Sequence, residues 1–168
     1  MRTMYIHKEP TGVLDVFGPT VQLLTSPEDS DTDYCVIKGT IPPGVSVPLH
    51  SHGDHESFYL LSGSVEVLSQ RGEAFEWLHA KPGDFIHIPG GAKHAFRNTS
   101  SEPTVQLITT TPKLGRFFVE IGRPISPGVP TALPTAEDLR RLVQVSERYG
   151  YWTGNPADNA AVGINLLP

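Results

Sequence analysis

The stretch from Gly44 to Gly63 reads GVSVPLHSHGDHESFYLLSG, and it brings two histidines and a glutamate together. His50 and His52 are two residues apart, so in an extended strand both imidazoles leave the same face, with Cα atoms roughly 6.5 Å apart. The Gly-Asp pair that follows favours a turn. Glu56 then begins the returning strand, from which its carboxylate can meet both rings. The spacing therefore predicts three ligands of one metal ion.

A second stretch, residues 83–98, is also punctuated by glycine and proline, and it contains a candidate fourth ligand, His94. Together the two stretches resemble the two motifs of the cupin superfamily, each of which fixes glycines and metal-binding side chains at set spacings. The matching residues are Gly44, His50, His52, Glu56 and Gly63 in the first motif, and Gly83, Pro89, Gly91, His94 and Asn98 in the second. Ten such positions rarely agree by chance, since glycine and proline each make up only about 5 to 7% of residues.

Over roughly residues 41–122 the sequence resembles the small, single-domain, quercetin dioxygenase-like cupins. The resemblance implies an all-β fold, the double-stranded β-helix or jelly-roll barrel of the cupins. It also implies that His50, His52, Glu56 and His94 bind the metal together. Small cupins often pair through their sheets, so we expect a homodimer.

Length and composition agree with one all-β domain. The 168 residues include 16 glycines and 16 prolines, which suit short strands joined by tight turns. We expect residues 1–40 to add strands that flank the barrel and residues 41–122 to form its core. Residues 123–168 are expected to form a linker, a helix and a tail within the same domain.

Charge and hydropathy exclude several classes of partner. The net charge is -5 and the 13 lysines and arginines are scattered, so we expect no nucleic-acid partner. The sequence has no run of 18 apolar residues, so we expect no membrane span and a soluble, cytoplasmic protein. The single cysteine, Cys35, cannot form an internal disulfide and is interpreted as a small buried hydrophobic residue.

Short apolar runs separated by turn residues predict strands at roughly ten-residue intervals, as in a sandwich or barrel. The predicted strands are Met4–Ile6, Val13–Phe17, Val21–Leu24, Tyr34–Ile41, Ser57–Leu61, Val65–Ser69, Phe75–His79, Phe85–Ile88, Ala95–Arg97 and Thr104–Thr110. Closing such a sheet into a barrel removes exposed edges.

The C-terminal region contains one clear helix, from Thr135 to Gly150. Thr135 can cap it, Asp138 completes a capping box, and Gly150 can end it. Its predicted apolar stripe consists of Leu139, Leu142, Val143 and Tyr149. We expect this helix to pack outside the barrel or on a partner subunit.

Three other C-terminal segments have weaker patterns. Residues 112–122 fit either a short helical turn or a final strand. Residues 123–134 are rich in proline and are expected to form an extended linker, and residues 155–168 an irregular tail.

Residue parity gives a first view of the barrel interior. Phe58 and Leu60 share the face of Glu56, and Phe96 shares the face of His94. We therefore expect these three apolar side chains to line the metal pocket as substrate contacts, or to be plain core. His55 has the opposite parity and should face away, although it stays an alternative ligand. No role is expected for the remaining histidines, His7, His79 and His87.

Three imidazoles and one carboxylate would leave two positions of an octahedral metal open. Such donors accept one divalent transition metal per chain, Fe, Mn, Ni, Co or Zn, and the sequence does not choose among them. The first interpretation is a metal-dependent dioxygenase acting on a small enolic or aromatic compound. Its resemblance to dioxygenases implies that Glu56 also acts as the catalytic base. The alternatives are a non-catalytic module that binds or senses a small molecule, and a metal-dependent isomerase or cyclase.

Overall fold

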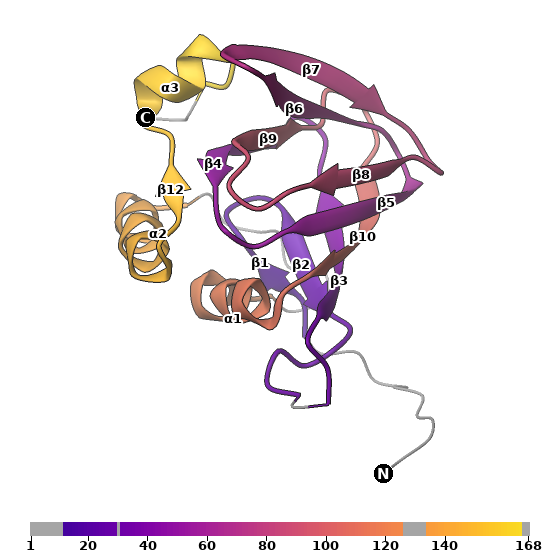
Figure 1. Cartoon of the computed structure of the whole chain (residues 1–168), viewed down its shortest axis with the longest axis vertical. Helices are drawn as coiled ribbons and strands as arrows, with labels where there is room; N and C mark the ends of the chain where they lie inside the picture. The colour runs from indigo at the N-terminus through magenta and orange to yellow at the C-terminus, as the bar shows by residue number, and fades with distance from the viewer. Residues whose placement is uncertain (1–11, 30, 126–133, 166–168) are drawn as a thin grey trace.

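The computed structural model describes residues 12–29, 31–125 and 134–165, and within them the chain forms two antiparallel β-sheets (Figure 1). The seven-stranded sheet has the order β11 (Arg123–Pro124), β1 (Leu14–Asp15), β2 (Thr20–Leu23), β3 (Cys35–Ile41), β10 (Thr104–Thr110), β5 (Glu56–Ser62) and β8 (Phe85–Ile88). The five-stranded sheet has the order β12 (Trp152–Thr153), β4 (Ser46–Ser51), β9 (His94–Arg97), β6 (Val65–Arg71) and β7 (Ala74–Ala80). This double-stranded β-helix confirms the predicted fold class.

The main core lies between the two sheets, because strands of both contribute their inward-facing residues. Along β3 and β10 buried and more exposed side chains alternate, as expected for strands with one face in a core. The buried apolar cluster consists of Val21, Leu23, Cys35, Ile37, Ile41, Phe58, Leu60, Val65, Val67, Ala80, Ile88, Phe96 and Ile108. Cys35 is fully buried in it, as predicted.

The turn between β5 and β6 shows why glycine is needed in this meander. Gly63 has a φ of +72°, a conformation that side chains with a Cβ rarely adopt. A Cβ there would also lie 2.3 Å from the carbonyl oxygen of Pro103. Both the backbone conformation and the lack of space for a Cβ therefore require glycine at residue 63.

The predicted strands agree with the observed ones to within one or two residues, with two exceptions. The first predicted run, Met4–Ile6, lies outside the described residues. The second, Val13–Phe17, was predicted too long, since the strand there covers only Leu14–Asp15. Phe17 has a φ of 66° and begins a tight turn, which ends β1 and lets the chain return as β2.

The open choice for residues 112–122 is decided in favour of a helix. The helix α1 (Pro112–Ile121) begins after Thr111, whose side chain accepts a hydrogen bond from the backbone nitrogen of Leu114. The predicted linker begins with the short strand β11, which pairs with β1. Residues 126–133 of that linker lie outside the described residues.

The predicted C-terminal helix is confirmed as α2 (Ala136–Tyr149), including its capping box and its terminal Gly150 in the left-handed conformation. Its predicted apolar stripe was wrong in part. Leu139 and Val143 are 40% and 43% exposed. Leu142 and Tyr149 instead pack with the buried Val145 against α1. The helix packs there because α1 offers it an apolar surface outside the barrel (Figure 1).

The expectation of an irregular tail from residue 155 was wrong. A short helix, α3 (Pro156–Ala161), begins at Asn155, which forms a capping box with Asp158. Before it, β12 pairs with β4 and extends the five-stranded sheet. None of the helices among the described residues is long and apolar enough to cross a membrane.

Candidate metal centre

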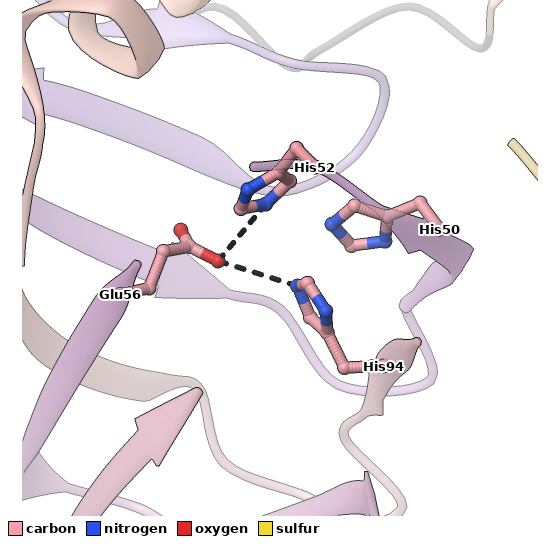
Figure 2. A group of neighbouring side chains, drawn as sticks. All are labelled: His50, His52, Glu56 and His94. Carbon is pink, nitrogen blue, oxygen red and sulfur yellow. Dashed lines mark ion pairs between the residues drawn. The ribbon is translucent and has the colours of Figure 1, made fainter. Parts of the chain in front are cut away.

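The four predicted ligands come together at one place between the two sheets (Figure 2). His50 in β4 and His94 at the start of β9 are direct cross-strand partners in the five-stranded sheet. His52 follows β4 by one residue. Glu56 begins β5, which belongs to the seven-stranded sheet. The cluster therefore joins the two sheets.

The donor atoms of the cluster converge on a common point. One ligand atom from each residue lies within 4.8 Å of all the others. The Oε2 atom of Glu56 is 3.3 Å from Nε2 of His52 and 3.2 Å from Nε2 of His94 (Figure 2). The ring centroids of His50 and His94 are 4.1 Å apart. Since a metal with bonds of about 2.1 Å separates opposite ligands by about 4.2 Å, small side-chain rotations would suffice to bind one ion.

Each histidine of the cluster uses its Nδ1 atom to bind a backbone carbonyl. The Nδ1 atom of His50 lies 2.7 Å from the Pro48 carbonyl oxygen, and that of His94 lies 2.9 Å from the Ala92 oxygen. His52 makes the same contact with Asp54, at 2.9 Å. A carbonyl only accepts hydrogen bonds, so each Nδ1 must carry the proton. In the neutral rings, Nε2 is then left with a free lone pair.

The electrostatics of the cluster differ from one residue to the next. Burial opposes ionisation of Glu56, but its contacts with His52 and His94 prevail and lower its pKa to about 2. Burial also opposes protonation of His52, but the nearby Glu56 carboxylate raises the pKa of that ring overall. His50 differs, because burial and the neighbouring rings of His94 and His52 lower its pKa to about 3. Glu56 is thus ionised and His50 neutral at physiological pH.

These observations test whether the residues fit a metal. Three imidazole lone pairs and an ionised carboxylate are all electron-pair donors to a cation, and they lie together in a largely buried space. The Nε2 atom of His94 is buried with no partner in hydrogen-bond geometry, although it is close to the carboxylate of Glu56. A divalent cation would satisfy all four groups at once. The donor set therefore fits a transition metal.

Sequence reasoning missed a set of side chains behind the cluster. Asp54 was interpreted only as a turn residue, but its side chain is buried and accepts hydrogen bonds from two hydroxyl groups. One belongs to Thr111 and the other to Tyr151, at 2.6 Å in the second case. Tyr151 also packs its ring 5.2 Å from that of His52. No local pattern in the sequence could reveal this contact, because it joins residues 97 positions apart.

The two motif loops touch each other directly beside the cluster. The Gly91 backbone nitrogen donates to the His52 carbonyl oxygen at 2.7 Å. A Cβ on Gly90 would lie 2.3 Å from the carbonyl oxygen of Gly53, in the turn between His52 and Glu56. The position of the second loop thus depends on the absence of a side chain at residue 90.

The expected substrate contacts and the histidines outside the four-residue cluster lie in different environments. Phe58, Leu60 and Phe96 are 3%, 1% and 3% exposed and belong to the main core. The ring of Phe96 lies 6.2 Å from that of His94, so it is near the cluster, and its contact with a substrate stays a prediction. His55, His79 and His87 have exposed side chains outside the cluster, while His7 lies outside the described residues.

A cavity of about 420 Å³ lies away from the cluster, on the other face of the five-stranded sheet. It is lined by Leu49, Leu68, Phe75, Trp77, Lys93, Trp152, Asp158, Ala161 and Val162. None of the four cluster residues lines it, so it is not the candidate metal centre.

Comparisons with known proteins agree with this architecture. Residues 38–110 match the family model described as a cupin domain. The structure of oxalate decarboxylase from Bacillus subtilis at pH 4.6 aligns with a TM-score of 0.52 at 23% identity, over 62% of this chain and 27% of that one. The chain has a cupin fold. The family match also supports the resemblance to the cupin superfamily that the two motifs indicate.

Two further proteins are similar to the chain over part of its length. A quercetin 2,3-dioxygenase from Bacillus subtilis (strain 168) is 24% identical over 124 residues, 73% of this chain and 36% of that protein. A Klebsiella pneumoniae protein with a double-stranded β-helix domain aligns at 21% identity over 65% of this chain and 82% of its own, with a TM-score of 0.45. The chain therefore spans about a third of the length of the dioxygenase, 36%.

Proposed function

We propose that the chain binds one divalent transition metal through His50, His52, Glu56 and His94, and uses it to oxidise a small enolic or aromatic compound with dioxygen. The observation that carries the proposal is the convergence of four electron-pair donors, three of them histidines whose Nδ1 atoms are committed to backbone carbonyls. A redox-capable metal bound there would supply the one-electron chemistry that reactions of dioxygen require.

Glu56 is the residue that would handle the substrate proton. Its pKa of about 2 keeps it ionised at neutral pH, so its carboxylate can accept a proton from a bound hydroxyl group. Enols and catechols have more acidic hydroxyls than aliphatic alcohols, so they give up a proton to a carboxylate more readily. The similarity to a quercetin 2,3-dioxygenase supports the same substrate class.

The surroundings of the cluster limit the size and approach of a substrate. His52, Glu56 and His94 are buried, whereas His50 is only partly buried, so we propose that a substrate approaches the cluster on the His50 side. On the core side the space is filled by packed aromatic rings, with Phe58 and Phe96 4.9 Å apart. We propose that a small planar substrate enters beside His50 and meets Phe96 next to His94.

The metal is tested before the activity. Purified protein, reconstituted anaerobically with Fe(II), Mn(II), Ni(II), Co(II) or Zn(II), should hold one metal per chain by elemental analysis. The double variant His52→Ala with His94→Ala should hold none. The matched control His55→Ala removes an adjacent but exposed histidine and should keep full occupancy. Full occupancy of the double variant would refute the assigned ligand set.

The reaction is tested by oxygen uptake. Each metal-loaded form is supplied with flavonols, catechols and β-diketones, and uptake should depend on both metal and substrate. A small molecule that co-purifies tightly, with no oxygen uptake under any metal, would instead support a binding or sensing module. Conversion of a keto compound without oxygen uptake would support an isomerase or cyclase.

A further inference from the structure

The C-terminal segment 150–165 lies beside β4, the strand that carries His50. Its strand β12 pairs with β4, with Thr153 opposite His50. The Leu49 carbonyl accepts a hydrogen bond from the Gly154 nitrogen at 2.7 Å, and the Leu49 nitrogen donates to the side chain of Asn159 at 2.8 Å. Residues on one side of His50 are thus held by a segment about 100 positions later in the chain.

Tyr151 is the residue of this segment whose ring lies next to His52. Its side chain is only 7% exposed and belongs to an aromatic group with Phe117 and Tyr149. One face of the phenol packs near His52, with ring centroids 5.2 Å apart. Its hydroxyl donates to Oδ2 of Asp54 at 2.6 Å.

Asp54 connects this hydroxyl to the metal-binding ring. Its backbone carbonyl accepts the Nδ1 proton of His52, and this contact sets which nitrogen of His52 faces the cluster. Its side chain is fixed from two directions, by Tyr151 and by Thr111 at the start of α1. The backbone of residue 54 is therefore held in place by its own buried side chain.

From this geometry we propose that Tyr151 is a positioning residue for the metal ligand His52, acting through Asp54. The inference rests on the proposed metal site. Without the Tyr151 hydroxyl, one oxygen of the buried Asp54 carboxylate would lose its donor, and the carboxylate would turn towards solvent or another donor. The carbonyl of Asp54 and the ring of His52 would then lose their fixed orientation.

The test compares two variants of the same aromatic group in the full-length protein. Tyr151→Phe keeps the ring and removes the hydroxyl, while Tyr149→Phe removes a neighbouring hydroxyl that does not reach Asp54. Partners of a metal-binding histidine contribute about 10- to 100-fold to metal affinity, and Tyr151 acts at one remove. We expect Tyr151→Phe to weaken Co(II) and Zn(II) binding about tenfold in competition with a chelator. Tyr149→Phe should leave both affinities unchanged.

Two further measurements separate positioning from simple stability. The visible absorption spectrum of the Co(II) form should change in Tyr151→Phe and not in Tyr149→Phe, because only a displaced ligand alters it. Asp54→Asn should weaken metal binding as well. The double variant that completes this Asp54 cycle, Asp54→Asn with Tyr151→Phe, should bind metal no more weakly than the weaker-binding of the two single variants. Asp54→Asn alone serves as the test if Tyr151→Phe folds poorly, since Asn keeps the backbone carbonyl and the side-chain size.

The outcomes distinguish this proposal from the one on which it rests. A wild-type protein that binds neither ion would refute the metal site and, with it, the role of Tyr151. A wild-type protein that binds both ions, with Tyr151→Phe equal to it in affinity and spectrum, would refute the positioning role alone. Additive losses in the Asp54 cycle would show that Tyr151 does not act through Asp54.

Discussion

Replacing Gly90 with alanine should disable the proposed metal centre without changing any of the four proposed ligands. A Cβ at residue 90 would lie 2.3 Å from the carbonyl oxygen of Gly53, the residue that follows His52. Carbon and oxygen atoms that are not bonded to each other approach to about 3.3 Å at closest. One of the two loops must therefore move by about 1 Å. Metal bonds tolerate changes of only about 0.2 Å. A shift of the Gly53 turn by about 1 Å therefore moves His52 and Glu56 well outside bonding positions.

The second loop cannot relieve this clash without cost to the same site. The Gly91 nitrogen donates to the His52 carbonyl at 2.7 Å, so if the second loop moves instead, this hydrogen bond lengthens and His94 moves with the loop. We expect a loss of metal affinity of about 100-fold, at the upper end for residues that orient metal ligands. Either direction of movement leads to this result.

Gly91→Ala provides the matched control. Gly91 has a φ of +84°, but a Cβ at residue 91 would have no atom within 4 Å, so alanine there strains the backbone without meeting the first loop. The strain costs about 1 to 2 kcal/mol in the free energy of unfolding. Chelator competition with Zn(II) measures affinity, and urea unfolding of the metal-free proteins measures stability. The reasoning is refuted if Gly90→Ala binds Zn(II) as the wild type does, or if Gly91→Ala loses as much affinity.

Two further predictions concern the same site, and a third concerns the assembly of the chain. Burial lowers the pKa of His50 from 6.5 to about 3, so between these two pH values the unfolded chain binds a proton that the folded chain does not. In the presence of a chelator that removes metal, the free energy of unfolding should therefore fall as the pH drops from 6.5 towards 3. His50→Gln should flatten that decline in urea titrations. Glu56→Gln should keep much of the metal yet slow oxygen uptake about 10²- to 10⁴-fold, as expected for loss of a base; unchanged turnover would contradict its role. We also propose a homodimer, for which light scattering should give twice the 18.3 kDa chain mass, and a monomer mass would overturn it.

The strands could be predicted from sequence because their signals are local. Side-chain alternation and glycine turns act within a few residues, so β5 to β10 agree with their predicted ranges. The helix α2 carries its own capping box and was found for the same reason. The buried face of α2 could not be predicted, because it depends on where α1 lies. The capping box at Asn155 and Asp158 was visible in the sequence and was overlooked in a segment interpreted as an irregular tail.

The four clustered residues could be predicted because motif spacing specifies which side chains share a face and where turns bring them back. The residues that support them could not. Tyr151 lies 97 positions from Asp54, and no periodicity links the two. Gly90 lies between the motif residues Pro89 and Gly91, at a position that the motif leaves variable, so the pattern gave it no role. Its importance comes from the contact with Gly53, which exists only once both loops are folded.

The placement of the cluster also explains why so many of its supporting contacts cross between parts of the chain. His50 and His94 belong to the five-stranded sheet and Glu56 to the seven-stranded one, so an ion held by all three would link the two halves of the barrel. The carboxylate is shared by two imidazole rings, and the His94 Nε2 atom has no partner in hydrogen-bond geometry. The donors must therefore be held together by contacts elsewhere in the chain. The loop contact at Gly90 and the hydroxyl of Tyr151 supply that restraint, and both act on the short turn between His52 and Glu56, where the two sheets meet.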